Sequence, residues 1–146
     1  MIEDVVLTPL TIVHTKGGNV LHGMKSTDHG YAGFGEAYFS TVEQGAIKGW
    51  KRHHLMVLNI IVPVGAIRFV IFDDRKGSVS VNEFQVINIS ESENYCRLTV
   101  PPMVWLGFQG IKNKNILINI ASIEHSPHEV DQKTLTEINF DWEILK

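Results

Sequence analysis

Two basic side chains able to take part in proton transfer lie two residues apart in the segment Gly49-Trp50-Lys51-Arg52-His53-His54. In a strand, alternate side chains face the same way, so Lys51 and His53 share one face while His54 points to the other. Histidine changes charge near neutral pH and can remove a proton, whereas the lysine cation can stabilise an oxyanion or bind phosphate. The spacing therefore predicts a site in which His53 is the base and Lys51 the cation.

The same segment resembles the first metal-binding motif of cupin proteins, but most of the ligands are absent. The three ligand positions of that motif fall on Lys51, His53 and Leu58, and only His53 is a metal-ligand type. In the second motif, Met103 and Leu106 stand in place of glycine and histidine. A transition metal in such a site normally needs three protein ligands, so we expect no metal and no other cofactor.

The elements that must hold this segment are strands. Short runs rich in Val, Ile, Phe and Tyr recur between turn signals, which predicts an all-β fold. The runs are residues 5–7, 34–40, 55–62, 66–72, 79–89, 95–100 and 116–121. Residues 67–72 are apolar at nearly every position, so we expect a barrel or sandwich in which this strand is covered on both faces. One short helix is predicted near the C-terminus, because residues 126–129 read Ser-Pro-His-Glu.

Size and charge exclude several classes of protein. The chain has 146 residues, of which 44% are hydrophobic, and this predicts one domain over residues 1–146. The net charge is -3 and there are no runs of like charge, so the sequence predicts no basic surface for binding nucleic acid or an anionic membrane. The single cysteine excludes an intrachain disulfide, and the N-terminus lacks a secretory signal. No apolar run approaches the ~20 residues of a membrane helix, so we expect a cytoplasmic protein.

Several segments in order along the chain resemble the dTDP-4-dehydrorhamnose 3,5-epimerase family. They are residues 65–75, 92–94 and 101–108, together with residues 34–38, which resemble the N-terminal substrate strand of that family. Residues 48–51 stand where the family has Arg-Gly-Leu-His. The resemblance spans most of residues 28–142. The central stretch is also similar to nucleotide-sugar 3,4-ketoisomerases, which carry two histidines at the positions of Lys51 and His53.

Both resemblances imply a cupin jelly-roll barrel, a homodimer and a nucleotide-linked 4-keto-6-deoxy sugar as substrate. The ketone acidifies protons on neighbouring carbons, so the reaction needs a base, a group that stabilises the enolate and an acid. The chain departs from the family at each of these positions. The basic histidine of the epimerases falls on Lys51, their second histidine on Leu106 and their tyrosine acid on Asn119. Asn119 can donate a hydrogen bond to an oxyanion but cannot deliver a proton.

The resemblance also implies the residues that bind the substrate. Lys48 stands where the family has an arginine that faces the diphosphate. A lysine at this position retains the positive charge but cannot form the two parallel hydrogen bonds of an arginine. Glu36 is implied as a substrate contact, and Tyr38 shares its strand face, although packing is the commoner role of such an aromatic. Arg97 interrupts an apolar strand, so it either faces the phosphates or forms a structural ion pair.

Two functional hypotheses follow from these residues. The first is a metal-independent epimerase or ketoisomerase acting on a dTDP-linked, or other nucleotide-linked, 4-keto-6-deoxyhexose in surface polysaccharide biosynthesis. In that enzyme His53 moves the proton, Lys51 and Asn119 stabilise the enolate, and Lys48 and Glu36 hold the nucleotide sugar. The second is a catalytically inactive cupin that binds a nucleotide sugar. The altered positions Lys51, Leu106 and Asn119 motivate this alternative.

Overall fold

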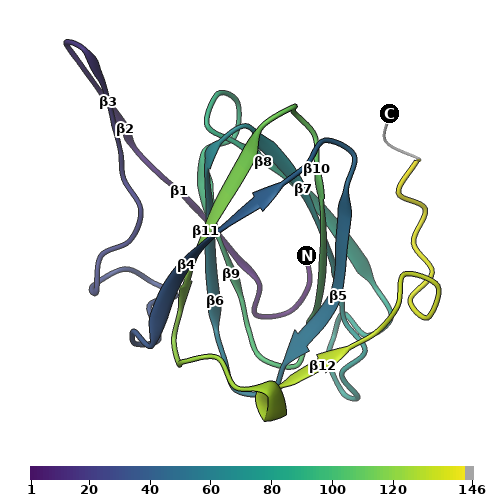
Figure 1. The fold of residues 1–146 in the computed structure, drawn as a ribbon. Helices are drawn as coiled ribbons and strands as arrows, with labels where there is room; N and C mark the ends of the chain where they lie inside the picture. Colours follow the sequence, from purple (N-terminus) through teal and green to yellow (C-terminus); the bar gives the residue numbers. More distant parts are fainter. Residues whose placement is uncertain (144–146) are drawn as a thin grey trace.

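The computed structural model describes residues 1–143, which form two facing antiparallel sheets and a projecting hairpin (Figure 1). Within these residues the strand order is β1-β9-β6-β11-β4 in the first sheet and β12-β5-β10-β7-β8 in the second, and β2 pairs with β3. The bounds are β1 Val6–Pro9, β2 Ile12–Thr15, β3 Gly18–Leu21, β4 Glu36–Val42, β5 Ile47–His53, β6 Leu58–Val64, β7 Ala66–Phe72, β8 Phe84–Ser90, β9 Cys96–Val100, β10 Trp105–Gly110, β11 Asn115–Ala121 and β12 Val130–Gln132. The expected all-β, cupin-like fold is confirmed.

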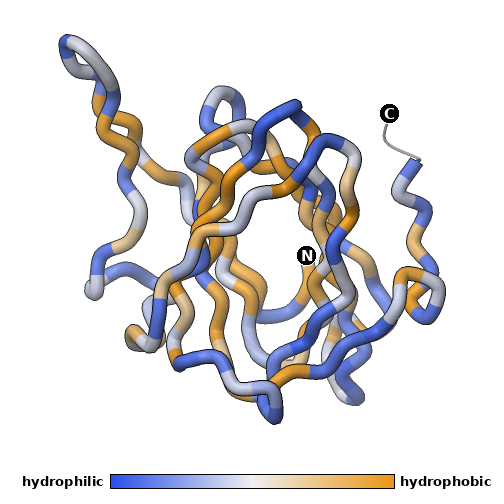
Figure 2. Tube along the Cα trace, in the orientation of Figure 1, coloured by the Kyte–Doolittle hydropathy of each residue, from blue (hydrophilic) through white to orange (hydrophobic). Residues whose placement is uncertain are grey.

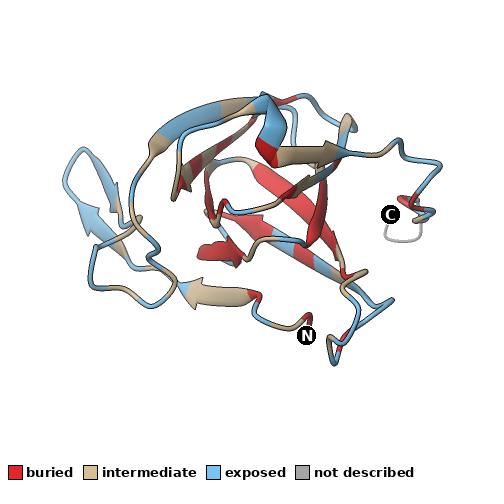
Figure 3. Cartoon of the chain, turned by 90° about the horizontal axis from the view of Figure 1, so that it is seen from below, coloured by how far each residue is buried: buried red, intermediate tan, exposed pale blue. Residues whose placement is uncertain are grey.

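The hydrophobic core lies between the two sheets. Inward side chains alternate along the strands, as Leu117, Asn119 and Ala121 do on β11. Strand β7 is buried on both faces, as its continuous apolar sequence predicted. Its inner residues Ile67, Phe69 and Ile71 join the core. Figure 3 shows buried residues concentrated on the facing sheets, whereas the hairpin β2–β3 is exposed.

The outer face of the second sheet is covered by the C-terminal segment. Trp50 of β5 and Trp105 of β10 pack there with Ile138 and Trp142. The rings of Trp50 and Trp142 lie 5.6 Å apart. Such aromatic pairs stabilise beyond their buried area, so they anchor the outer face of β5 to the C-terminal segment. The other face of β5 carries side chains that point between the sheets.

The short helix predicted at residues 126–129 is a single 3-10 turn, η1, spanning Pro127–Glu129. Ser126 forms no side-chain cap, and the Glu129 carboxylate does not return to the Ser126 amide as a capping box would require. That carboxylate turns inward instead, toward His53. None of the helical segments in residues 1–143 has the length and apolar character needed to cross a membrane.

A candidate active site between the sheets

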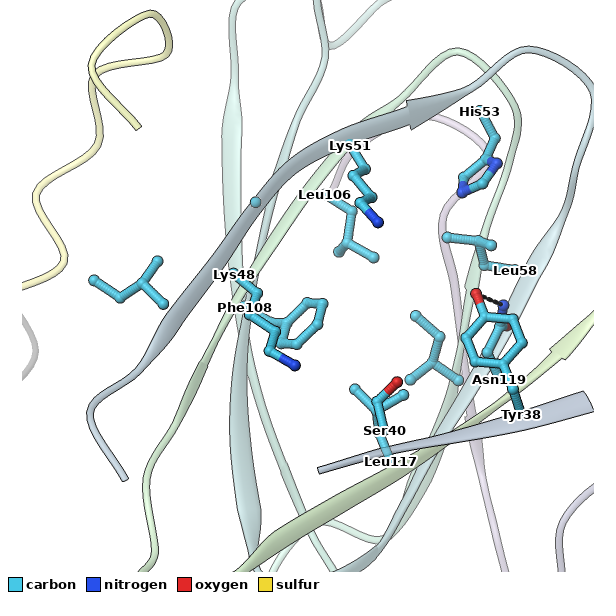
Figure 4. A pocket seen from close by; sticks show the side chains of 13 residues that line it. Tyr38, Ser40, Lys48, Lys51, His53, Leu58, Leu106, Phe108, Leu117 and Asn119 are labelled. Carbon is cyan, nitrogen blue, oxygen red and sulfur yellow. Dashed lines mark hydrogen bonds between the residues drawn. The ribbon is translucent and has the colours of Figure 1, made fainter. Parts of the chain in front are cut away.

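A cavity of about 400 Å³ opens between the two sheets (Figure 4). Its walls come from β5 and β10 on one side and from β4, β6 and β11 on the other. It is lined by Tyr38, Ser40, Ile47, Lys48, Gly49, Lys51, His53, Leu58, Ile60, Leu106, Phe108, Leu117 and Asn119. Five of these residues are aliphatic and one is phenylalanine, and six carry polar side-chain groups that converge on the cavity. This composition is typical of a small-molecule site.

The cations Lys48 and Lys51 both line this cavity although strict alternation would place them on opposite faces. Lys51 pairs with Leu106, but Lys48 pairs with Phe108, so β5 has one more residue than β10 between these pairs. Such a bulge reverses the alternation locally. Gly49 permits it, because a Cβ on Gly49 would lie 2.8 Å from the Cα of Gly107. The bulge therefore brings a second cation to the cavity.

His53 is held by a buried carboxylate. Its Nδ1 lies 2.7 Å from Oε2 of Glu129, and both side chains are 9% exposed. Glu129 Oε1 also accepts hydrogen bonds from the backbone amides of Leu55 at 2.7 Å and Met56 at 2.9 Å. Burial acts to raise the pKa of Glu129, but the hydrogen bonds from His53, Leu55 and Met56 outweigh it and lower that pKa from 4.5 to about 2. Glu129 is therefore ionised at neutral pH.

The ionised carboxylate sets the tautomer of His53. A carboxylate can only accept hydrogen bonds, so Nδ1 carries a hydrogen and donates it to Glu129. In the neutral ring the other nitrogen, Nε2, then has a free lone pair. His53 lines the cavity, and Figure 4 shows its ring pointing into it from β5. The arrangement makes His53 competent to remove a proton from a bound molecule.

The electrostatic character of the cavity is positive. Lys51 is exposed to it, and Lys48 Nζ donates to the carbonyl of Thr41 at 3.1 Å. None of the described residues that line the cavity is acidic. The Glu129 carboxylate lies behind His53 and is bound by it and by two backbone amides, so the two ammonium groups that face the cavity favour a bound anion. Such a cavity suits a phosphate-bearing ligand and an enolate.

Two of the three positions at which the cupin metal ligands are missing are apolar, and the third is Lys51. Leu58 and Leu106 line the cavity and are almost fully buried. No group of three or more histidine, cysteine, aspartate or glutamate side chains suited to a metal ion occurs in residues 1–143. Apart from its bond to Glu129, His53 shares this wall of the cavity with Lys51 and with apolar side chains. Proton transfer is the chemistry that this set of side chains can perform.

Asn119 and Tyr38 lie on the opposite wall. Asn119 Oδ1 accepts from the amide of Asn59 at 3.1 Å, and its Nδ2 donates to the Tyr38 hydroxyl at 2.9 Å. Asn119 therefore lines the cavity, and one of its amide hydrogens is donated to Tyr38. Tyr38 is 39% exposed and reaches the cavity with Ser40 from β4.

Glu36 and Arg97, both predicted to bind substrate, are not among the residues that line the cavity. Glu36 shares a strand face with Tyr38, but its Oε1 accepts from the amide of His125 at 3.0 Å. Arg97 is fully buried on the other face of the first sheet, where its Nη1 lies 2.9 Å from the Asp28 carboxylate. It also donates to the carbonyls of Gly23 and His29. Of the two alternatives for Arg97, the structure shows the ion pair, because Cys96 and Leu98 take the inward positions of β9.

Replacing Arg97 with leucine is expected to lower the free energy of unfolding by about 3 kcal/mol, because Asp28 and two carbonyls lose their buried donor. Urea unfolding measures this loss. Lys112→Leu, at an exposed position, is the matched control and should change stability little. The folded Arg97→Leu protein should bind a nucleoside diphosphate as tightly as the wild type. Full stability with weakened binding would instead place Arg97 at the phosphates.

Glu129 is the functional residue that sequence reasoning missed. The Ser-Pro-His-Glu pattern predicts a helix start, in which glutamate is an ordinary N-terminal residue. Its partner is fixed by tertiary structure, since β12 pairs with β5 and sets Val130 opposite His53. The available signal was a lone histidine on an inward strand face, which needs a polar partner when buried.

The chain is similar to known sugar isomerases and epimerases. No family model matches the chain. A dTDP sugar isomerase from Desulfovibrio desulfuricans G20 has a structure that matches with a TM-score of 0.93 and 33% identity, covering 97% of this chain and 92% of that one. A probable low-salt glycan biosynthesis epimerase of Haloferax volcanii is 26% identical over 137 residues, which are 92% of this chain and 87% of the relative. A dTDP-4-dehydrorhamnose 3,5-epimerase from Elizabethkingia anophelis shares the fold, with a TM-score of 0.80 and 15% identity over 98% of this chain and 83% of that one.

Proposed function

Since this chain belongs to the dTDP-4-dehydrorhamnose 3,5-epimerase-like family of dTDP-sugar isomerases, we propose that it isomerises a nucleotide-linked 4-keto-6-deoxyhexose without a metal. The single observation that carries the proposal is the His53–Glu129 pair, which leaves the lone pair of Nε2 free in a cavity with two cations. His53 removes the proton from a carbon next to the ketone. The electrons of that bond form the enolate, whose oxygen carries the charge.

Two lysine side chains, Lys51 and Lys48, balance the negative charges of the enolate and the diphosphate. Lys51, on the same inward face as His53, offsets the enolate charge, and Lys48 binds the diphosphate as a point charge. The apolar walls at Leu58, Leu106 and Phe108 exclude water and accommodate the 6-methyl group of a deoxy sugar. Charge interactions are stronger in such an enclosure than in water. Glu36 lies on the Tyr38 face of β4, and we propose that it contacts the nucleotide sugar outside the cavity.

The catalytic residues differ from the family pattern in this proposal. His53 and Glu129 supply the base where the epimerases use a histidine at the position of Lys51. The 33% identity to a dTDP sugar isomerase supports a dTDP-linked sugar, and the likeness to a glycan biosynthesis epimerase supports a role in surface polysaccharide biosynthesis. We propose that the protein acts in the cytoplasm and that residues 1–146 form one domain. Cell fractionation, with an antibody that detects the protein, tests the location.

We further propose that the protein is a homodimer. Phe39 is 70% exposed on the edge strand β4, Phe34 just before it is 64% exposed, and Val13 and Val20 of the projecting hairpin are also exposed. Figure 2 shows hydrophobic residues along the stem of this hairpin, outside the barrel. A second copy would cover both the free edge of β4 and this apolar surface. Sedimentation that gives the mass of one chain would refute the dimer.

The reaction is tested by incubating the protein with dTDP-4-keto-6-deoxyglucose in heavy water and following the sugar by NMR. Deuterium at C3 or C5 with inversion identifies an epimerase, and a ketone at C3 identifies a ketoisomerase. Saturable binding of the nucleotide sugar without any exchange would overturn the enzyme and leave the inactive binding protein. This sugar nucleotide carries both acidic carbons, C3 and C5, and the nucleotide named for the dTDP sugar isomerase.

A further inference from the structure

Two carboxylates two positions apart connect β12 to β5, one on each face of the second sheet. Glu129, just before β12, turns inward and binds His53. Asp131, within β12, turns outward and lies opposite Arg52 in the β12–β5 ladder. Its Oδ2 accepts from Arg52 Nε at 3.0 Å and from Arg52 Nη2 at 2.6 Å. The residue next to the base is therefore bound by the strand that follows the carboxylate partner of the base.

Arg52 is held in place on its other side as well. Its Nη1 donates to Asp74 Oδ1 at 3.0 Å, and its guanidinium lies 4.6 Å from the ring centroid of Trp105. Trp105 is 1% exposed, and its Nε1 donates to the other oxygen of Asp74 at 2.9 Å. A planar guanidinium that meets a carboxylate with two donors and also stacks on an aromatic face is restricted to one orientation. Arg52 thus connects β12 to the buried tryptophan of β10.

Strand β12 has few other attachments. It spans three residues at the edge of the second sheet. None of the three belongs to either hydrophobic cluster formed within residues 1–143. A short edge strand that contributes no core side chain is expected to open more readily than the central strands. The two bonds from Arg52 to Asp131 oppose such opening.

The Asp131 carboxylate is ionised at neutral pH, because hydrogen bonds from Arg52 and from His54 lower the pKa of Asp131. Its Oδ1 lies 2.9 Å from Nε2 of His54, whose side chain is 39% exposed. The two bonds from Arg52 reach the other oxygen and do not depend on that contact. Arg52 is therefore the main partner of Asp131.

On the basis of the proposed function, we infer that Arg52 and Asp131 are positioning residues for the base. Their ion pair fixes β12 against β5 beside His53, and this holds the Glu129 carboxylate on His53 Nδ1. Two backbone amides fix Oε1 of Glu129, whereas the distance from Oε2 to the ring depends on how β12 lies along β5. Neither Arg52 nor Asp131 lines the cavity. The pair acts on the reaction only through the tautomer of His53.

A double-mutant cycle of Asp131→Ala and Glu129→Gln tests this role, with kcat measured on dTDP-4-keto-6-deoxyglucose. Asp131→Ala should lower kcat about 10–10²-fold, because misplacing a catalytic group by about 1 Å costs up to about 10²-fold. In the Glu129→Gln background the same alanine should cost nothing further, since a residue that acts through Glu129 has no effect once the tautomer is lost. Binding of dTDP should change little, because both cavity lysines lie on β5.

A carboxylate on the segment after β12 supplies the matched control. Glu137 is exposed and accepts from the amide of Thr134 on the same segment. Glu137→Ala should retain the wild-type kcat in both backgrounds. A loss equal to that of Asp131→Ala would show that the effect comes from disturbance of the C-terminal segment and would overturn the role of Asp131.

Nitrogen-15 NMR of the His53 imidazole tests the positioning without any substrate. The hydrogen should lie on Nδ1 in the wild type, and Asp131→Ala should show a mixture of the two neutral tautomers. Arg52→Lys should change the spectrum in the same direction, because lysine keeps the charge but cannot bind Asp131 with two donors and Asp74 with a third. Circular dichroism melts should show that both variants fold.

Three further results would overturn the inference. A further loss of kcat when Asp131→Ala is added to Glu129→Gln shows that Asp131 acts independently of Glu129. A wild-type tautomer of His53 in folded Asp131→Ala shows that the ion pair does not position the ring. Weaker dTDP binding at unchanged kcat shows an effect on binding instead. If the wild-type protein exchanges no deuterium into the sugar, the proposed function fails, and the His53 tautomer in Asp131→Ala still decides whether the pair positions the ring.

Discussion

Replacing His53 with glutamine is expected to lower kcat by about 10³-fold, within the range for loss of a general base. Glutamine retains a polar side chain of similar reach toward Glu129 but has no lone pair able to take a proton at neutral pH. Deuterium exchange into the substrate should fall by the same factor, because the step that is lost is proton removal. Binding of dTDP should change little, since the two lysines remain. Steady-state kinetics, exchange by NMR and calorimetry measure the three quantities.

The next residue supplies a matched control. His54 points away from the cavity and its Nε2 lies 2.9 Å from Asp131 on the outer face. His54→Gln should retain nearly full kcat. Equal losses in the two variants would attribute the effect to disturbance of β5, and unchanged exchange in His53→Gln would remove His53 from the mechanism.

Replacing Glu129 with glutamine is expected to reduce kcat by about 10²–10⁴-fold while preserving the fold at neutral pH. The amide oxygen can still accept from Leu55 and Met56, but its NH₂ group then faces His53 Nδ1. That donor requires Nδ1 to accept, so the ring hydrogen moves to Nε2 and the base loses its lone pair. The comparable tautomer error in a serine protease triad costs about 10⁴-fold. Nitrogen-15 NMR of the imidazole should show hydrogen on Nδ1 in the wild type and on Nε2 in Glu129→Gln.

The same carboxylate makes stability depend on acid. The pKa of Glu129 is lowered from 4.5 to about 2, so its ionised form stabilises the folded protein. This contribution is fully present above pH 4.5 and is lost as pH falls toward 2, with a magnitude on the order of 3 kcal/mol. The stability difference between wild type and Glu129→Gln should therefore shrink from pH 7 to pH 2.5 in urea unfolding. A difference that stays constant over this range would contradict the ionised pair.

The sequence predicted the inward pair on β5 because strand periodicity is a local property. Lys51 and His53 line the cavity, as alternation requires. Lys48 was predicted only through family resemblance, since alternation places it on the outer face. The bulge that turns it inward depends on how β5 meets Gly107 of β10, a contact between residues far apart in the sequence. Local sequence patterns cannot predict contacts between residues that are far apart in the chain.

The other partners in the site are also products of tertiary structure. Glu129 reaches His53 across 76 positions of sequence, and Asn119 reaches Tyr38 across 81. Both pairs depend on which strands are neighbours, which the order of apolar runs does not specify. For Arg97 the sequence indicates the kind of partner but not which residue it is. An arginine within an apolar strand indicates an anionic partner. That this partner is Asp28 depends on the path of the loop before β4, which the sequence does not reveal.

Removal of a proton from a 4-ketosugar by His53, without a metal, is measured by the rate at which deuterium enters dTDP-4-keto-6-deoxyglucose in heavy water. The wild-type protein is held in excess chelator. We predict a rate equal to that without chelator, and one reduced about 10³-fold in His53→Gln. Exchange that disappears on chelation and returns with a divalent metal would show that a metal is required. Exchange that is unchanged in His53→Gln would show that His53 is not the base.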